Sequence, residues 1–127
     1  MRQLIAVMLM VVGAIHLLPV AGLLGRQRLT QLYGLRFEEP NLEILMRHRA
    51  LLFGLLGLFF LFAACKPSLH IVAFVVGLLS AGPFIWLAWA VGNYNTQLWR
   101  VVLADIVAVV CLLVAIIAHL VVQRTAS

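Results

Sequence analysis

Long apolar runs separated by short polar segments make up most of this chain of 127 residues. A helix that crosses a hydrocarbon layer of about 30 Å needs roughly 20 apolar residues at 1.5 Å per residue. Strands of a membrane barrel would alternate apolar and polar positions over about ten residues, and these runs do not alternate. The pattern therefore predicts an all-α protein, a single domain over residues 1–127 in which four transmembrane helices form a bundle: residues 4–24, 42–65, 69–92 and 99–122.

The polar segments predict connections of different kinds. Residues 66–68 are expected to form a tight hairpin and residues 92–95 a short polar turn. The first connection, residues 25–40, is longer. Within it, residues 28–33 are expected to form a short interfacial helix that turns Leu29, Leu32 and Tyr33 toward lipid.

Charged residues enter the beginning of the second predicted transmembrane helix. Asn41 is the expected N-cap, and Glu43 lies in the first turn, where the helix dipole favours an acid. Glu43 and Arg47 are four residues apart and can pair. Arg47 shares a helical face with Gly54, and small residues mark close helix contacts, so we expect Arg47 to point into the bundle. Arg49, nearly opposite, is expected to extend to the lipid headgroups.

A stripe of small residues follows the fourth predicted helix at spacings of four and three. This period is typical of left-handed helix packing. The stripe can pack within one chain or between two chains. Its members are Ala104, Ala108, Cys111, Ala115 and Ala118.

Composition supports the membrane interpretation. The chain is 65% hydrophobic and 10% charged, whereas soluble domains carry about 25% charged residues. The net charge of +5 is spread over helix ends, which excludes a nucleic-acid-binding patch. Residues 4–24 could instead be a signal peptide, but this run exceeds the usual 7–15 apolar residues and favours a retained helix. Cys65 and Cys111 lie in apolar segments and predict neither a disulfide nor a metal site.

Orientation in the lipid bilayer stays open at this level. Both termini and the hairpin at residues 66–68 share one side, and this side carries fewer basic residues than the other. The positive-inside rule then places the long first connection in the cytoplasm. If Arg47, Arg49 and Arg100 belong to a functional site and do not determine the orientation, the two sides carry equal numbers of basic residues and the rule gives no preference.

Ionisable groups within the membrane mark the candidate site. His16 and Asp105 are each expected roughly 10 Å inside the same leaflet, counted at 1.5 Å per residue. An unpaired Asp at this depth costs about 2.5–3.5 kcal/mol, and Arg47 or a charged His16 is a better partner for it than Arg100. Pro19 and Pro83 have no N–H to donate, so each leaves a backbone carbonyl near the candidate site without its helical hydrogen bond. The candidate pocket comprises His16, Tyr33, Glu43, Arg47, Asn93, Tyr94, Asn95, Arg100 and Asp105.

The order of several short motifs resembles the DoxX-like four-helix membrane proteins. The motifs are Gly13 with His16, then Leu32-Tyr33-Gly34, then residues 49–54, and residues 45–50 are the most distinctive stretch. The resemblance implies a multi-pass protein of the bacterial inner membrane with a role linked to redox or lipid chemistry. It transfers no catalytic residue.

Three interpretations of the polar cluster follow. The polar residues lock the helices together, or they line a pocket for a small amphipathic molecule, or they catalyse a reaction. The leading functional hypothesis is a binding or accessory protein for a lipid, a quinone-like molecule or a larger membrane complex, with other subunits or a homo-oligomer as partners. The alternative is a small isomerase or redox-linked enzyme that uses His16 and Asp105 in proton transfer. The sequence identifies no cofactor.

Overall fold

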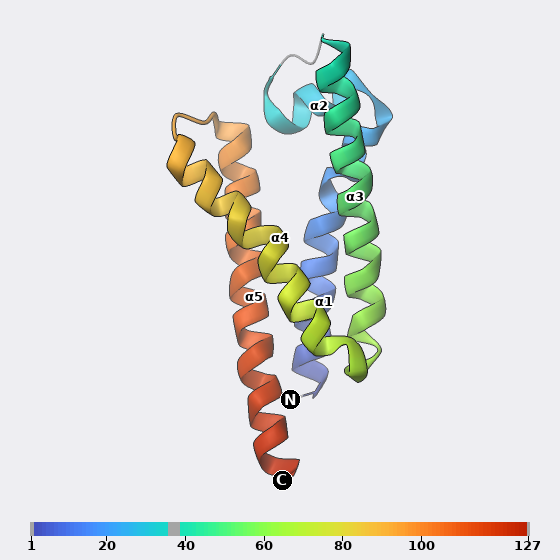
Figure 1. Ribbon diagram of the computed structural model, residues 1–127, viewed down its shortest axis with the longest axis vertical. Helices are drawn as coiled ribbons and strands as arrows, with labels where there is room; N and C mark the ends of the chain where they lie inside the picture. The colour runs from blue at the N-terminus through green and yellow to red at the C-terminus, as the bar shows by residue number, and fades with distance from the viewer. Residues whose placement is uncertain (1, 36–38, 127) are drawn as a thin grey trace.

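The computed structural model describes residues 2–35 and 39–126, which are mainly helical and contain no strand (Figure 1). Two short 3-10 helices, η1 (Leu18–Leu24) and η2 (Pro67–Leu69), lie between the α-helices. The predicted all-α class is confirmed. The α-helices are α1 (Arg2–Leu17), α2 (Arg26–Tyr33), α3 (Pro40–Ala64), α4 (His70–Val91) and α5 (Thr96–Ala126).

The described helices include four segments that are long and apolar enough to cross a membrane. At most a third of the most apolar window of each segment is buried within the protein, so most of their apolar surface faces outward, as it does in lipid. Both ends of the chain lie at the same end of the bundle as η2 (Figure 1). The segments are Arg2–Val20, Pro40–Ala64, Pro67–Val91 and Thr96–Thr125.

The first apolar run does not form one continuous α-helix. α1 ends at Leu17, and η1 continues the chain to Leu24 with Pro19 in its first turn. Proline has no N–H to donate, which is tolerated at the beginning of a helix and not in its interior. The predicted helix over residues 4–24 is therefore divided where Pro19 stands.

α3 begins before the predicted cap. Glu39 has extended backbone angles, and its side chain accepts a hydrogen bond from Leu42 N at 2.9 Å, so Glu39 is the N-cap. The prediction of Asn41 as N-cap is wrong, because Pro40 is suited to the first helical position and starts the helix there. Asn41 instead donates its side-chain amide to Glu39 Oε1 at 3.0 Å.

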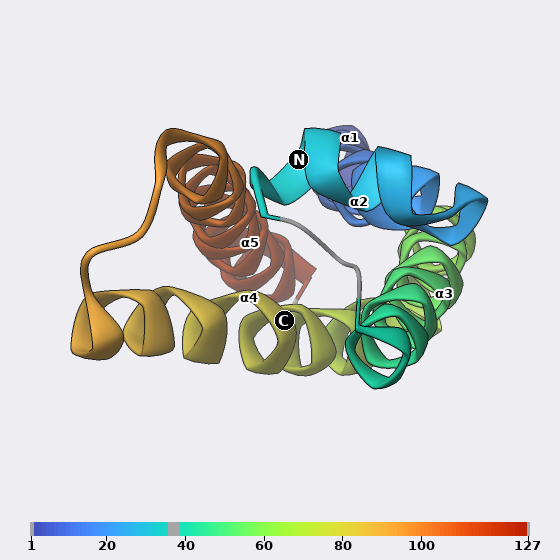
Figure 2. The ribbon, with the colours of Figure 1, turned by 90° about the horizontal axis from the view of Figure 1, so that it is seen from above.

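α2 confirms the short helix expected in the first connection, but it packs differently. Seen from above, α2 lies over the end of the bundle (Figure 2), and it contacts η1 and α5. Leu29 and Tyr33 are buried against Leu98 and Val101 of α5. The expectation that these side chains face lipid is wrong, because α2 folds back onto the bundle.

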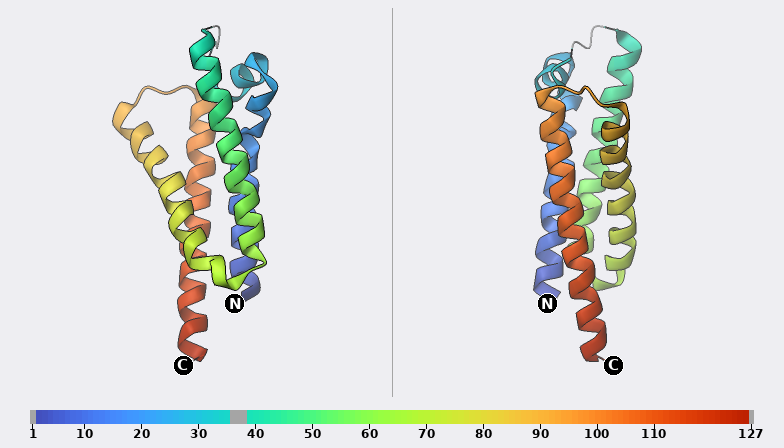
Figure 3. Two further views of the ribbon diagram at one scale, coloured as in Figure 1. Left: turned by 45° about the vertical axis from the view of Figure 1, so that its right-hand side comes forward. Right: turned by 90° about the vertical axis from the view of Figure 1, so that its left-hand side faces the viewer.

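α1 occupies the centre of the helix packing. Its main neighbours are α3 and α5, whereas α4 packs on α5 and diverges from α3 beyond their shared turn (Figure 3). A Cβ atom at Gly13 would lie 3.0 Å from Gly57 O, and one at Gly57 would lie 2.9 Å from Gly13 O. The α1 and α3 backbones thus touch at two glycines, which no larger residue permits at this spacing.

The small-residue stripe of α5 faces the interior of this chain. Ala108, Ala115 and Ala118 are fully buried in the core shared with α1 and α4, and Ala104 and Cys111 are half-buried. The stripe thus allows close packing within one chain, the first of the two arrangements that the sequence allowed.

Candidate functional site

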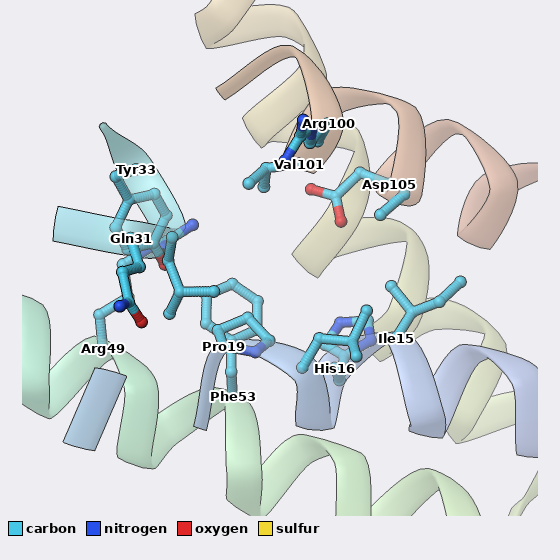
Figure 4. A pocket seen from close by; sticks show the side chains of 13 residues that line it. Ile15, His16, Pro19, Gln31, Tyr33, Arg49, Phe53, Arg100, Val101 and Asp105 are labelled. Atoms are coloured by element: carbon cyan, nitrogen blue, oxygen red, sulfur yellow. The ribbon is translucent and has the colours of Figure 1, made fainter. Parts of the chain in front are cut away.

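A pocket of about 210 Å³, the Asp105 pocket, lies between η1, α2 and the facing parts of α1, α3 and α5 (Figure 4). Its walls are mainly apolar and include Ile15, Pro19, Phe53 and Val101. Polar side chains reach it from several helices, so it has the mixed lining that small-molecule sites show. The polar lining residues are His16, Gln31, Tyr33, Arg49, Arg100 and Asp105.

The arginine that α3 contributes to this pocket is Arg49. Arg47 is exposed and does not line the pocket, so the prediction that Arg47 points inward and Arg49 outward is wrong. The buried residues of α3 are Ala50, Gly57, Phe60, Ala63 and Ala64. The mean direction of this buried face around the helix lies nearer to Arg49 than to Arg47. Gly54, which served as the marker in the prediction, lies toward one side of that face and next to Val20 of η1. Helical spacing from the true centre brings Arg49 inward.

Aromatic rings hold the Arg49 guanidinium in place. The group lies 4.6 Å from the centre of the Phe53 ring and 5.5 Å from the centres of the Tyr33 and Phe84 rings. It also donates a hydrogen bond to the Tyr33 hydroxyl. Each cation–π contact contributes about 0.5–2 kcal/mol, depending on how far the cation is desolvated. Rings from α2, α3 and α4 therefore fix one positive charge at the pocket wall.

Asp105 supplies the opposite charge from α5. It is 6% exposed and makes no hydrogen bond to any residue of the described ranges. Arg49 attracts it electrostatically across the pocket. Arg49 is therefore the positively charged partner of Asp105, a role for which the sequence analysis expected Arg47 or a charged His16. Because Asp105 lines the pocket, a ligand with a hydrogen-bond donor can pair with its carboxylate there.

His16 forms the floor of the pocket and is fully engaged. Its Nδ1 donates to Val12 O at 2.9 Å, and in the neutral ring its Nε2 then accepts from Ser80 Oγ at 2.8 Å. Its ring also packs against Phe53 and Phe60, at centroid distances of 5.5 Å and 4.8 Å. His16 thus fastens α1 to α4.

The sequence analysis missed this role of Ser80. It is the one hydroxyl residue in α4, residues 70–91. A single hydroxyl in an otherwise apolar membrane helix is the signal that could have identified a partner for a buried histidine.

The polar turn before α5 supports the pocket without lining it. Asn95 donates to Tyr33 O at 2.7 Å and accepts from Leu98 N at 2.8 Å, so it joins the end of α2 to the beginning of α5. Tyr94 stacks on Trp99, and Asn93 is exposed.

The predicted site residues therefore fall into two groups. His16, Tyr33, Arg100 and Asp105 meet at the pocket. Residues that the sequence placed in the pocket but the structure places outside its lining are Glu43, Arg47, Asn93, Tyr94 and Asn95.

Within the ranges that the structure covers, no three His, Cys, Asp or Glu side chains gather where a metal ion could bind. Comparison with known proteins adds no relative, since no family model, curated protein or solved structure matches this chain. The resemblance to DoxX-like proteins stays a prediction.

Proposed function

We propose that this membrane protein binds the oxygen-bearing headgroup of an amphipathic molecule, a lipid or a quinone-like compound, in the Asp105 pocket. The observation that carries the proposal is Asp105 itself. The residue is more than nine-tenths buried, its carboxylate accepts no hydrogen bond within the described ranges, and it lines a pocket that also holds Arg49. Polar groups in a membrane interior mark ligand pathways and sites by default.

The charges of the pocket describe the complementary ligand. A donor on the ligand would satisfy Asp105, and an acceptor would meet Arg100 and the Arg49–Tyr33 pair. The apolar walls would hold an adjoining hydrocarbon portion. A volume of about 210 Å³ is below the 300–1,000 Å³ usual for whole drug-sized ligands, so the pocket suits a headgroup or a single ring whose chain extends into the bilayer.

The hydrogen bonds of His16 favour binding over proton transfer. Both ring nitrogens are occupied within the bundle, so a catalytic role for His16 would require the bond to Ser80 to break first. A carrier or accessory subunit needs no such step. We place this role in the bacterial inner membrane on the strength of the sequence resemblance. Partner subunits or a second copy of the chain would receive the ligand from the pocket.

Native mass spectrometry of the protein released from lipid nanodiscs tests the proposal. The wild-type protein should retain a stoichiometric small molecule or lipid. Asp105→Asn should reduce its occupancy roughly 10-fold or more, because a charge-assisted hydrogen bond contributes about 1.5–3 kcal/mol and each 1.4 kcal/mol is tenfold.

Glu43→Gln is the matched control for this experiment. It removes an acid at the same end of the bundle but outside the pocket lining, and should leave occupancy unchanged. Bare wild-type chains, or an equal adduct on folded Asp105→Asn protein, would overturn the proposal and leave the polar cluster as a lock between helices. Circular dichroism and size-exclusion chromatography establish that each variant is folded.

A further inference from the structure

A second polar pocket is lined by residues from the beginnings of α1 and α4 and from the end of α5. These parts of the helices lie at the end of the bundle opposite α2 (Figure 1). We call this pocket the His70 pocket. Its volume is about 190 Å³, and its polar lining consists of Arg2, His70, His119 and Gln123. These side chains come from different helices, so the pocket is a product of the fold and not of one local motif.

His70 has an unsatisfied nitrogen. The residue is 4% exposed, and Nε2 is buried without a hydrogen-bond partner in the part of the chain that the structure describes. His70 and His119 pack against the same Phe74 ring, at centroid distances of 6.2 Å and 5.7 Å. Leaving a buried polar atom unpaired costs about 1–3 kcal/mol. In the imidazolium form, or in the tautomer with hydrogen on Nε2, an anion that accepts a hydrogen bond from Nε2–H recovers this cost.

The charge around the His70 pocket has one sign. The acidic residues that the structure describes are Glu39 and Glu43, at the beginning of α3, and Asp105, in the first third of α5. The beginnings of α3 and α5 lie at the other end of the molecule (Figure 1). Asp105 precedes His119 by 14 residues on α5, which corresponds to about 21 Å along a helix. Arg2 is therefore not neutralised by an acid of the described ranges, and the pocket attracts anions.

An apolar groove adjoins the His70 pocket on the outer face of α4 and α5. Its volume is about 480 Å³, and it shares His119 and Gln123 with the pocket. Its other walls include Val75, Leu78 and Leu120. Leu78 follows His70 by eight residues on α4, so the groove extends about 12 Å from the polar end toward the middle of the membrane.

We propose that the His70 pocket binds a phosphate-bearing anion, and that the adjoining groove holds its hydrocarbon chain, as in an anionic phospholipid. Arg2 would pair with the phosphate, and His70 would donate Nε2–H to one of its oxygens. Basic residues at the membrane surface attract anionic lipids in the same way. This site is independent of the Asp105 pocket.

Lipid titration followed by native mass spectrometry tests this inference. The protein is titrated in detergent with phosphatidylglycerol or with phosphatidylcholine of the same acyl chains. The wild type should retain phosphatidylglycerol at least 10-fold better. Arg2→Gln and His70→Gln should each lose most of this preference. His48→Gln, which changes an exposed histidine on α3 at the other end, should keep it.

A parallel titration of lipid-free protein with inorganic phosphate, followed by ³¹P NMR, separates the two sources of the anion. Phosphate that binds alone, with the same dependence on Arg2 and His70, supports the anion site and assigns it to the free ion. Phosphatidylglycerol binding without phosphate binding supports the lipid. Equal retention of the two lipids by the wild type, or an unchanged preference in folded Arg2→Gln protein, would overturn the proposal.

Discussion

The two ends of this bundle handle buried polarity in different ways. The Asp105 pocket combines an acid with arginines, is covered by α2, and holds Arg49 among aromatic rings. The His70 pocket contains a basic residue and imidazoles, has no described acid, and leaves a nitrogen of His70 unpaired. In a low-dielectric medium, two opposite charges offset much of the free energy that it costs to bury each of them. Charges of one sign have no such partner in the protein and need a bound ion to offset this cost. We therefore expect the side chains of the Asp105 pocket to be held in place by the protein itself, and those of the His70 pocket to be stabilised by a bound anion.

Among the replacements considered, that of Arg49 should have the largest effect, which is on the free energy of unfolding. Arg49→Ala leaves Asp105 without its opposite charge and empties the aromatic cage, so we expect a loss of about 3 kcal/mol in the free energy of unfolding. Arg47→Ala removes an exposed arginine two residues away and should cost under about 0.5 kcal/mol. Denaturant titration in micelles measures both, and equal losses would refute the assignment of Arg49 to the pocket.

Removing the Ser80 hydroxyl should have the next largest effect. Ser80→Ala leaves His16 Nε2 buried without a partner, which should cost about 2 kcal/mol. Ser68→Ala changes an exposed serine at the other end and should be neutral. The same titration measures the difference, and equal stabilities would mean that the His16–Ser80 bond does not join α1 to α4.

Adding an acid to the His70 pocket should make it resemble the Asp105 pocket. Gln123→Glu places a carboxylate four residues after His119, where it can pair with the imidazole and repel a phosphate. We expect the preference for phosphatidylglycerol over phosphatidylcholine to fall about tenfold, which corresponds to about 1.4 kcal/mol. Gln97→Glu, at the beginning of α5, is the control. An unchanged preference in folded Gln123→Glu protein would argue against anion binding in this pocket.

The smallest effect is expected at the aromatic cage. Phe84→Leu removes one of the rings around Arg49 and keeps an apolar side chain, so the cost should be about 0.5–1 kcal/mol in the free energy of unfolding. Phe62→Leu removes a ring on the exposed cation–π contact with Lys66 and should cost less. A larger loss in Phe62→Leu would show that the cage contributes little.

The sequence predicted the parts of the fold that depend on length and hydrophobicity. Bilayer thickness determined the four membrane-spanning segments, and the depth of His16 and Asp105 along their helices identified two pocket residues. Helix rotation was harder to predict. Gly54 indicated a face of α3 that lies at the edge of its packing, so Arg47 and Arg49 were interchanged.

Contacts between helices distant in sequence were not predictable from spacing. The bond between His16 and Ser80 depends on the inclination of α4, and the Tyr33–Arg49 contact depends on α2 folding back over the bundle. Both are determined by the packing of several helices together. A single sequence contains the hydrophobic periodicity of each helix, but no information on which helices contact each other.

The central position of α1 has a consequence for biogenesis. Because synthesis runs from the N-terminus, α1 enters the membrane before α5, which is one of its two main neighbours. The neighbours α3 and α4 share a tight turn but pack mainly on other helices, so the hairpin they form cannot serve as a nucleus. Such non-local pairing makes assembly slow and late. A nascent chain stopped after α4 can pair α1 with α3, but the faces of α1 and α4 that pack on α5 stay uncovered, so we expect it to be open to quality-control proteases until α5 arrives.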